Sequence, residues 1–313
     1  MSKFAPLHII SGYSFLQSGL TMKKIAQGIK SNDFYGAGLT DGHVMFGLPS
    51  FAETLTEINK PYILGMNIEL SGTNLSLFVL NDVGYQNLLA INTSIQRESL
   101  TLDILKEHKE GLVCVIETNH GEFKEKFVKE TEKVSTEFTK YLSQFSFIYG
   151  DDFYLGNEVT SKDEVKYANK VRKFANNFTY KCVAFPRIKY LKKEDAIVVE
   201  IVKAINDQVK DFKLKSLEGQ EYFMSEESYN KIYNNEELEN TINIVNQSTF
   251  DINKKRGEML RFPVENSPEE LKKLCFKNLA ERGLDNEVYQ KQLVHHYDRL
   301  WLILILNHLL HLS

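Results

Sequence analysis

The sequence predicts an α/β protein in which a distorted βα barrel is followed by a mainly helical segment. The first third of the chain alternates short apolar runs, which are typical of buried strands, with stretches whose apolar residues recur at helical spacing. After about residue 190 the helical spacing predominates. Because strands that alternate with helices usually pair in parallel, we expect a barrel or a layered sheet.

The expected elements follow one another closely along the chain. Strands are expected at residues 7–10, 38–40, 62–64 with 67–70, and 75–80. Helices are expected at residues 22–31, 51–59, 85–91, 194–205 and 236–247. Ser267 and Pro268, followed by two glutamates, predict a further helix start. The highly charged residues 121–140 are expected to form a solvated helix rather than a binding surface.

Composition limits the classes of function. The formal net charge of -4 argues against a protein that binds nucleic acid through its overall field, although local basic patches stay open. The 3 cysteines lie far apart, which suits a reducing cytoplasm, and the first residues do not resemble a signal peptide. Chemistry in βα folds collects at the carboxyl ends of strands. His8 and Asp41 fall at or near such ends, so a site is expected there.

An ordered series of motifs carries a family resemblance. It includes residues 11–16 (SGYSFL), 38–47 (GLTDGHVMFG), 60–65 (KPYILG), 78–89 (FVLNDVGYQNLL), 190–196 (YLKKEDA) and 271–284 (LKKLCFKNLAERGL). Over about residues 4–293 the chain thereby resembles the N-terminal PHP (polymerase and histidinol phosphatase) region of bacterial DNA polymerase III alpha subunits. The resemblance implies a PHP-type barrel in residues 1–200 and, in residues 201–293, the rest of that region with the helical start of the polymerase part.

The same resemblance implies a metal site that has lost most of its ligands. Carried over position by position, it leaves His8 and Asp41 as residual metal ligands. Positions where the family has histidine, aspartate or glutamate ligands hold other residues here: Pro6, Ile10, Gly42, Asn67, Arg187 and Lys189. Two cations in place of two ligands would repel a divalent metal and could substitute for its charge.

These losses predict that the domain hydrolyses no phosphate ester, because two-metal hydrolysis needs many ligands. Under this interpretation His8 is a hydrogen-bonded remnant and Asp41 a helix cap at a strand end. No cofactor is then expected in this chain, and Mn²⁺ or Zn²⁺ only if the site still functions.

Polymerisation in the resembled family depends on a palm domain that holds Mg²⁺ and is expected to lie beyond this sequence. The expected partners are therefore the remaining polymerase domains, a proofreading exonuclease subunit, and DNA through those domains. Residues 294–313 are atypical for the family and rich in histidine, which suggests a reading-frame change or a truncated gene. A histidine metal site, a membrane span and an exposed helix that seeks a partner are the alternatives for this tail. The apolar part is too short for a span, so no membrane partner is expected.

The sequence leaves three functions open. The leading one is a non-catalytic scaffold within an alpha subunit whose family is a DNA-directed DNA polymerase. The second is a stand-alone PHP metal-dependent phosphoesterase or 3'-5' exonuclease, and the third is a structural fragment without activity or partner.

Overall fold

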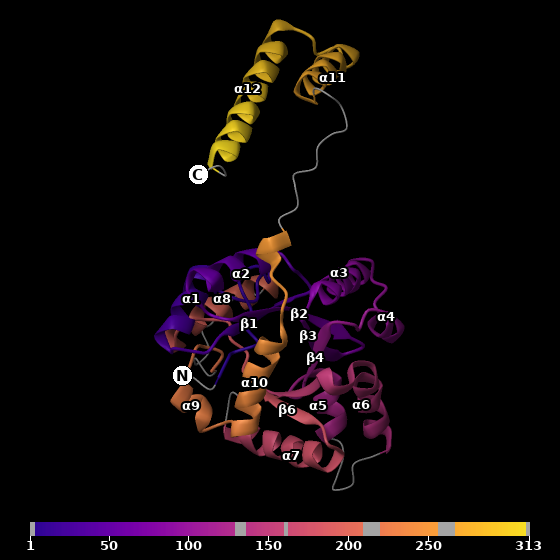
Figure 1. Cartoon of the computed structure of the whole chain (residues 1–313), viewed down its shortest axis with the longest axis vertical. Coiled ribbons are helices and arrows are strands. Elements are labelled where there is room, and N and C mark those ends of the chain that lie inside the picture. Colours follow the sequence, from indigo (N-terminus) through magenta and orange to yellow (C-terminus); the bar gives the residue numbers. More distant parts are fainter. Residues whose placement is uncertain (1–3, 129–135, 160–161, 209–219, 256–266, 311–313) are drawn as a thin grey trace. The chain divides into compact units, whose positions relative to one another are not determined.

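The computed structural model describes residues 4–128, 136–159, 162–208, 220–255 and 267–310 (Figure 1). The chain divides into two compact units, Met1–Lys255 and Arg256–Ser313, which are described separately. The functional subdivision at residues 200 and 293 stays a prediction.

The first unit is built on one six-stranded sheet in the order β1-β2-β3-β4-β5-β6. Its strands are β1 (Ala37–Gly42), β2 (Tyr62–Leu70), β3 (Thr73–Val79), β4 (Leu112–Glu117), β5 (Phe153–Asn157) and β6 (Lys181–Ala184). The predicted parallel pairing is confirmed for β1 with β2, β4 with β5, and β5 with β6. It is wrong for β3, which pairs antiparallel with β2 and β4. Only Ser71 and Gly72 separate β2 from β3, and both have positive φ, so the chain reverses in a tight hairpin.

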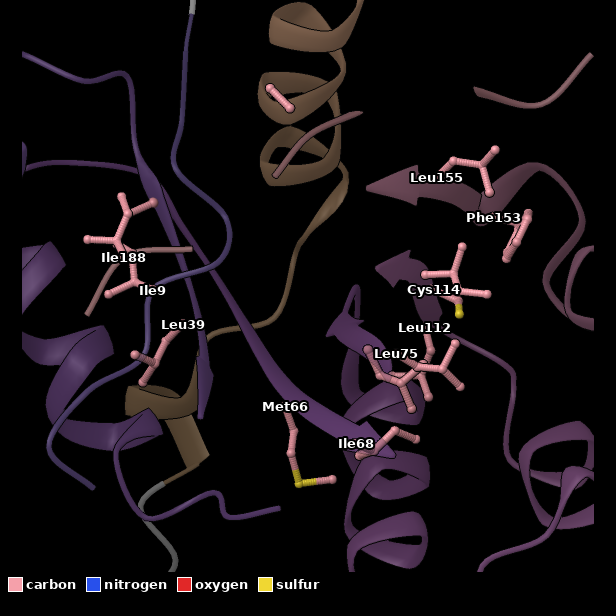
Figure 2. Packing of buried hydrophobic residues seen from close by; sticks show 14 of the residues in the cluster. Ile9, Leu39, Met66, Ile68, Leu75, Leu112, Cys114, Phe153, Leu155 and Ile188 are labelled. Carbon is pink, nitrogen blue, oxygen red and sulfur yellow. The ribbon is translucent and has the colours of Figure 1, made fainter. Parts of the chain in front are cut away.

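The segment at residues 7–10 joins the two ends of this sheet. Ile9 forms parallel bridges with Leu39 of β1 and with Ile188, which follows β6. The Thr40 and Ile10 amides donate to the Ile9 and Ile188 carbonyls at 2.9 Å each. Figure 2 shows the Ile9 side chain between Leu39 and Ile188. The predicted strand is therefore reduced to single bridges, and these close the sheet into a distorted barrel. The α/β class is confirmed.

Alternate residues of the strands face two separate cores. On β4, Val113 and Val115 belong to a small inner cluster, whereas Leu112 and Cys114 belong to a large outer one. The inner cluster draws on every strand from β2 to β6 and on α10 (Asn235–Gln247). Period-two alternation with both faces buried is what a barrel covered by helices requires.

Helices pack around the barrel, some of them in the connections between its strands (Figure 1). They are α1 (Met22–Ser31), α2 (Leu48–Glu57), α3 (Asp82–Gln96), α4 (Leu102–Glu107), α5 (Gly121–Val128), α6 (Thr136–Tyr149), α7 (Lys162–Phe178), α8 (Ala196–Asn206) and α9 (Glu226–Asn230). The helix predicted at residues 22–31 has the bounds of α1. The charged stretch at 121–140 is not simply solvated, because Phe123 and Phe138 are buried in the outer cluster; its residues 129–135 lie outside the described part.

The described residues of the second unit form two helices, α11 (Ser267–Glu281) and α12 (Glu287–Leu310). The helix start predicted at Ser267 is confirmed. The predicted tail begins inside α12, and its last residues, 311–313, lie outside the described residues. Within the described residues, no helix has both the length and the apolar character to span a membrane.

Candidate functional site

Polar side chains gather at one rim of the barrel because five strands point the same way. β3 runs antiparallel to both of its neighbours, so β1, β2, β4, β5 and β6 are mutually parallel. Their carboxyl ends therefore meet at one rim, where ligands bind in such folds. Five side chains lie on the corresponding segments: His8, Asp41, Glu117, Glu158 and Arg187.

Asp41, at the end of β1, is fully buried and held by neutral donors. Its Oδ1 accepts from the Ser11 amide and the Ser14 hydroxyl, and its Oδ2 accepts from the Ser11 hydroxyl, each at 2.7 Å. Burial raises the pKa of Asp41 while these serine hydrogen bonds oppose the rise. The expectation of a helix cap is wrong, because the donors belong to the loop after residue 10 and α2 begins only at Leu48.

His8 lies on the closing segment, buried against the ring of Phe185 with the ring centroids 4.7 Å apart. Its Nδ1 lies 2.8 Å from the Thr40 hydroxyl, and its Nε2 lies 3.6 Å from Glu117 Oε1. Nε2 has no hydrogen-bond partner among the described residues. Burial, followed by the nearby Arg187 charge, lowers the pKa of His8 well below its usual value. The predicted hydrogen-bonded role therefore holds for one ring nitrogen only.

Arg187 stands between two buried carboxylates. Its Nη2 lies 3.0 Å from Glu117 Oε2 and 3.3 Å from Glu158 Oε2. The Glu117 and Glu158 side chains are only 2% and 4% exposed, and Arg187 is 17% exposed. This cation occupies a position where the resemblance implies a metal ligand.

The two glutamates respond differently to the same guanidinium. Burial opposes ionisation of Glu158, but Arg187 and His120 together lower its pKa to about 2. Burial raises the pKa of Glu117 despite Arg187. The contacts explain the difference: Glu158 Oε2 also lies 2.7 Å from His120 Nε2, whereas Glu117 Oε1 accepts from the neutral Asn67 amide.

Three of these side chains come close enough together to hold one cation. Ligand atoms of Glu117, His120 and Glu158 all lie within 4.8 Å of one another. The sequence interpretation missed all three, because it followed only the positions of the resembled family. The available signal was local: Glu117 ends an apolar strand and Glu158 directly follows one.

The multinuclear metal site that a PHP resemblance implies does not fit these residues. Both oxygens of Asp41 are taken by serine donors, and Arg187 contacts the two carboxylates that a metal would need. Lys189 Nζ is likewise paired, 3.0 Å from Glu221 Oε1. His43, one position later than the expected histidine, is exposed. His8 thus reaches the acidic cluster, whereas the hydrogen bonds of Asp41 go to serines.

Comparisons with known proteins give the class first. Residues 6–158 match the family model described as PHP domain. Residues 6–158 thus resemble a PHP domain, and this match covers β1 to β5 of the barrel.

The relatives then point to a particular protein. The chain is 24% identical to the DNA polymerase III subunit alpha of Bacillus subtilis, over 94% of this chain and 28% of the relative. It is 27% identical to the same subunit of Haemophilus influenzae, over 83% of this chain and 24% of the relative. The chain therefore resembles the N-terminal PHP region of this subunit and spans about a quarter of the length of these relatives.

One solved structure that resembles the chain is an amidohydrolase from Chromobacterium violaceum. It is 12% identical, covers 58% of this chain and 86% of its own, and has a TM-score of 0.38.

Proposed function

We propose that this chain is a non-catalytic scaffold, the N-terminal region of a replicative DNA polymerase III alpha subunit in a bacterial cytoplasm. The observation that carries the proposal is Arg187, whose guanidinium lies between the two buried carboxylates at the barrel rim. A site that activates water against a phosphate ester needs open metal positions and free ligands. Here the charged groups neutralise one another instead.

The proposed partners follow from the relatives. The chain spans about a quarter of their length, so polymerisation, with its Mg²⁺ and its contact with DNA, is assigned to the remaining domains. The barrel would pack against those domains and offer a docking surface to a proofreading exonuclease. This role requires no catalytic activity at the barrel rim.

Hydrolysis assays test the catalytic half of the proposal. Purified wild-type chain is incubated with a 3'-tailed primer and with p-nitrophenyl phosphate, each with Mn²⁺ or Zn²⁺. We expect no turnover above the level of an Asp41→Asn variant. Turnover that the Asp41→Asn substitution abolishes would contradict the proposal.

A binding assay tests the scaffold half. The chain is immobilised and presented with the palm-containing remainder of an alpha subunit as a separate polypeptide, with bovine serum albumin as the control. Retention of the polymerase part, but not of the albumin, is the expected result. Equal retention of the polymerase part and of albumin would contradict the scaffold role.

The second candidate is a metal-dependent phosphoesterase or 3'-5' exonuclease that uses one divalent ion. It is favoured by the Glu117, His120 and Glu158 ligand atoms, which lie within 4.8 Å of one another. This candidate requires Arg187 to leave both carboxylates. Stoichiometric metal in the purified wild-type chain, measured by mass spectrometry, would favour it over the scaffold.

A further inference from the structure

One nitrogen of Arg187 joins two strands through their end carboxylates. Glu117 is the last residue of β4, and Glu158 directly follows β5. These strands are neighbours in the sheet and run parallel, so their ends bring two carboxylates to one place. Nη2 of Arg187 contacts an oxygen of each, at 3.0 and 3.3 Å. A cation that bridges two carboxylates is the arrangement a bound metal ion would also produce.

The burial of both carboxylates makes a counter-charge necessary. Neither glutamate side chain is more than 4% exposed, so water does little to stabilise a negative charge on it. An isolated buried carboxylate is so unfavourable that it needs a paired cation, a metal or a proton. The neutral Asn67 amide that donates to Glu117 cannot supply that charge.

We infer that the Arg187 guanidinium stands in for a metal ion in this barrel, so that Arg187 and a divalent cation compete for Glu117 and Glu158. The inference deepens the proposed scaffold function, on which it rests. It also agrees with the poor fit of a multinuclear metal set, because a side chain supplies the positive charge at these carboxylates.

The character of arginine fits this role. A guanidinium keeps its charge at every physiological pH and is desolvated more easily than an ammonium group, which suits a buried ion pair. Arg187 nevertheless leaves Nε without a hydrogen-bond partner among the described residues. Among the described residues, Nη2 is the guanidinium nitrogen that donates to the carboxylates, so Arg187 binds neither one in a bidentate fashion.

Removal of Arg187 would leave a set of ligands that suits zinc. Glu117, His120 and Glu158 provide two carboxylates and one imidazole, and both groups are ligand types that zinc accepts. His8 adds a buried Nε2 without a hydrogen-bond partner, 3.6 Å from Glu117 Oε1. The chain therefore holds a latent zinc site whose occupancy Arg187 prevents.

The test is zinc binding by the full chain, with zinc sulfate as the probe. Wild type, Arg187→Ala, Lys189→Ala and the double variant Arg187→Ala/Glu158→Gln are dialysed against zinc, and their metal content is measured by mass spectrometry. Lys189→Ala is the matched control, because it removes a cation two residues away that pairs with Glu221 instead. The histidines of residues 294–313 are present in all four proteins, so any zinc that they bind contributes equally to each measured zinc content.

We expect Arg187→Ala to bind one zinc ion per chain more than wild type, with affinity raised by about tenfold or more. The Lys189→Ala chain should match wild type, and the double variant should lose the added zinc. Equal zinc binding by wild type and Arg187→Ala would overturn the inference.

The folding of Arg187→Ala gives a second readout. If this variant is unfolded in chelator, added zinc should restore its circular dichroism spectrum, and unfolding that zinc does not reverse counts against the inference. The proposed function fails separately. Hydrolysis of phosphate esters by wild type would contradict the scaffold, whereas equal zinc contents would contradict only the role of Arg187.

Discussion

Asp41 and Glu117 are both acidic residues at the carboxyl end of a barrel strand, and both are buried, but their charges are balanced in different ways. Asp41 accepts three hydrogen bonds from Ser11 and Ser14. Glu117 shares the guanidinium of Arg187 with a second carboxylate. The serine-held site joins β1 to the loop at residues 11–14 through neutral donors, whereas the arginine-held site links the ends of β4 and β5 through charge. Equivalent strand ends can thus be stabilised by dipoles or by ions.

The largest effect is expected from Arg187→Met, which leaves Glu117 and Glu158 without their shared cation. Breaking a buried ion pair by removing one partner costs about 3–5 kcal/mol in free energy of unfolding. Urea unfolding in the presence of chelator measures it. Lys60→Met is the control, because Lys60 pairs with the largely exposed Asp33 and should cost less than about 1 kcal/mol. Similar costs for the two variants would contradict a charge-based role for Arg187.

A smaller loss is expected from Asp41→Asn. The side chain keeps one acceptor oxygen but loses its charge, and a hydrogen bond to a charged group contributes about 1.5–3 kcal/mol. We expect the free energy of unfolding to fall by about 2 kcal/mol. If Asp41→Asn lowered the free energy of unfolding more than Arg187→Met does in the same urea experiment, the serine hydrogen bonds would contribute more to stability than the ion pair.

A double substitution separates the two sites. In the Arg187→Met background, Glu117→Gln removes one of the two carboxylates that have lost their cation. This second substitution should raise the free energy of unfolding again by about 1–2 kcal/mol. Asp41→Asn in that background should not raise the free energy of unfolding, because the hydrogen bonds of Asp41 are to serines. A double-mutant cycle on unfolding free energies checks both. If the coupling free energy between Arg187 and Asp41 equals that between Arg187 and Glu117, the two sites are not independent.

The smallest effect belongs to Lys189→Met. Lys189 stands two residues after Arg187 at another inherited ligand position, but its partner Glu221 is 24% exposed. Ion pairs that water reaches contribute little, so we expect a loss below about 1 kcal/mol. Thermal unfolding of Lys189→Met and Arg187→Met, measured side by side, checks this prediction. Equal destabilisation by the two variants would contradict the idea that burial decides how much an ion pair contributes to stability.

Sequence reasoning reached the α/β class because apolar runs and helical spacing are local signals, whereas the choice of a barrel over a layered sheet came from the family resemblance. The bounds of α1 and the start of α11 followed from periodicity and capping residues. The direction of β3 did not, because a two-residue hairpin at Ser71 and Gly72 was not recognised as a turn. At the site, the sequence placed His8 and Asp41 at strand ends and identified Arg187 as a cation at a ligand position.

Glu117 and Glu158 each have a local signal, because one ends an apolar strand and the other follows one, but their meeting in space was beyond such reasoning. Glu117 and Glu158 are 41 residues apart by their numbers and meet only because β4 and β5 pair in parallel. His120, in the turn after β4, looks like any loop histidine until its distance to Glu158 is known. Long-range pairing of this kind has no local signature.

The most direct test of the account is the unfolding free energy of wild-type protein with chelator and with added Zn²⁺ or Mn²⁺. A metal bound to the native state would stabilise it by about 2.7 kcal/mol at one hundred times its dissociation constant. Because Arg187 already supplies the positive charge, we predict the same unfolding curve in all three solutions. A curve that shifts to lower urea when the metal is chelated would show that the barrel still depends on an ion.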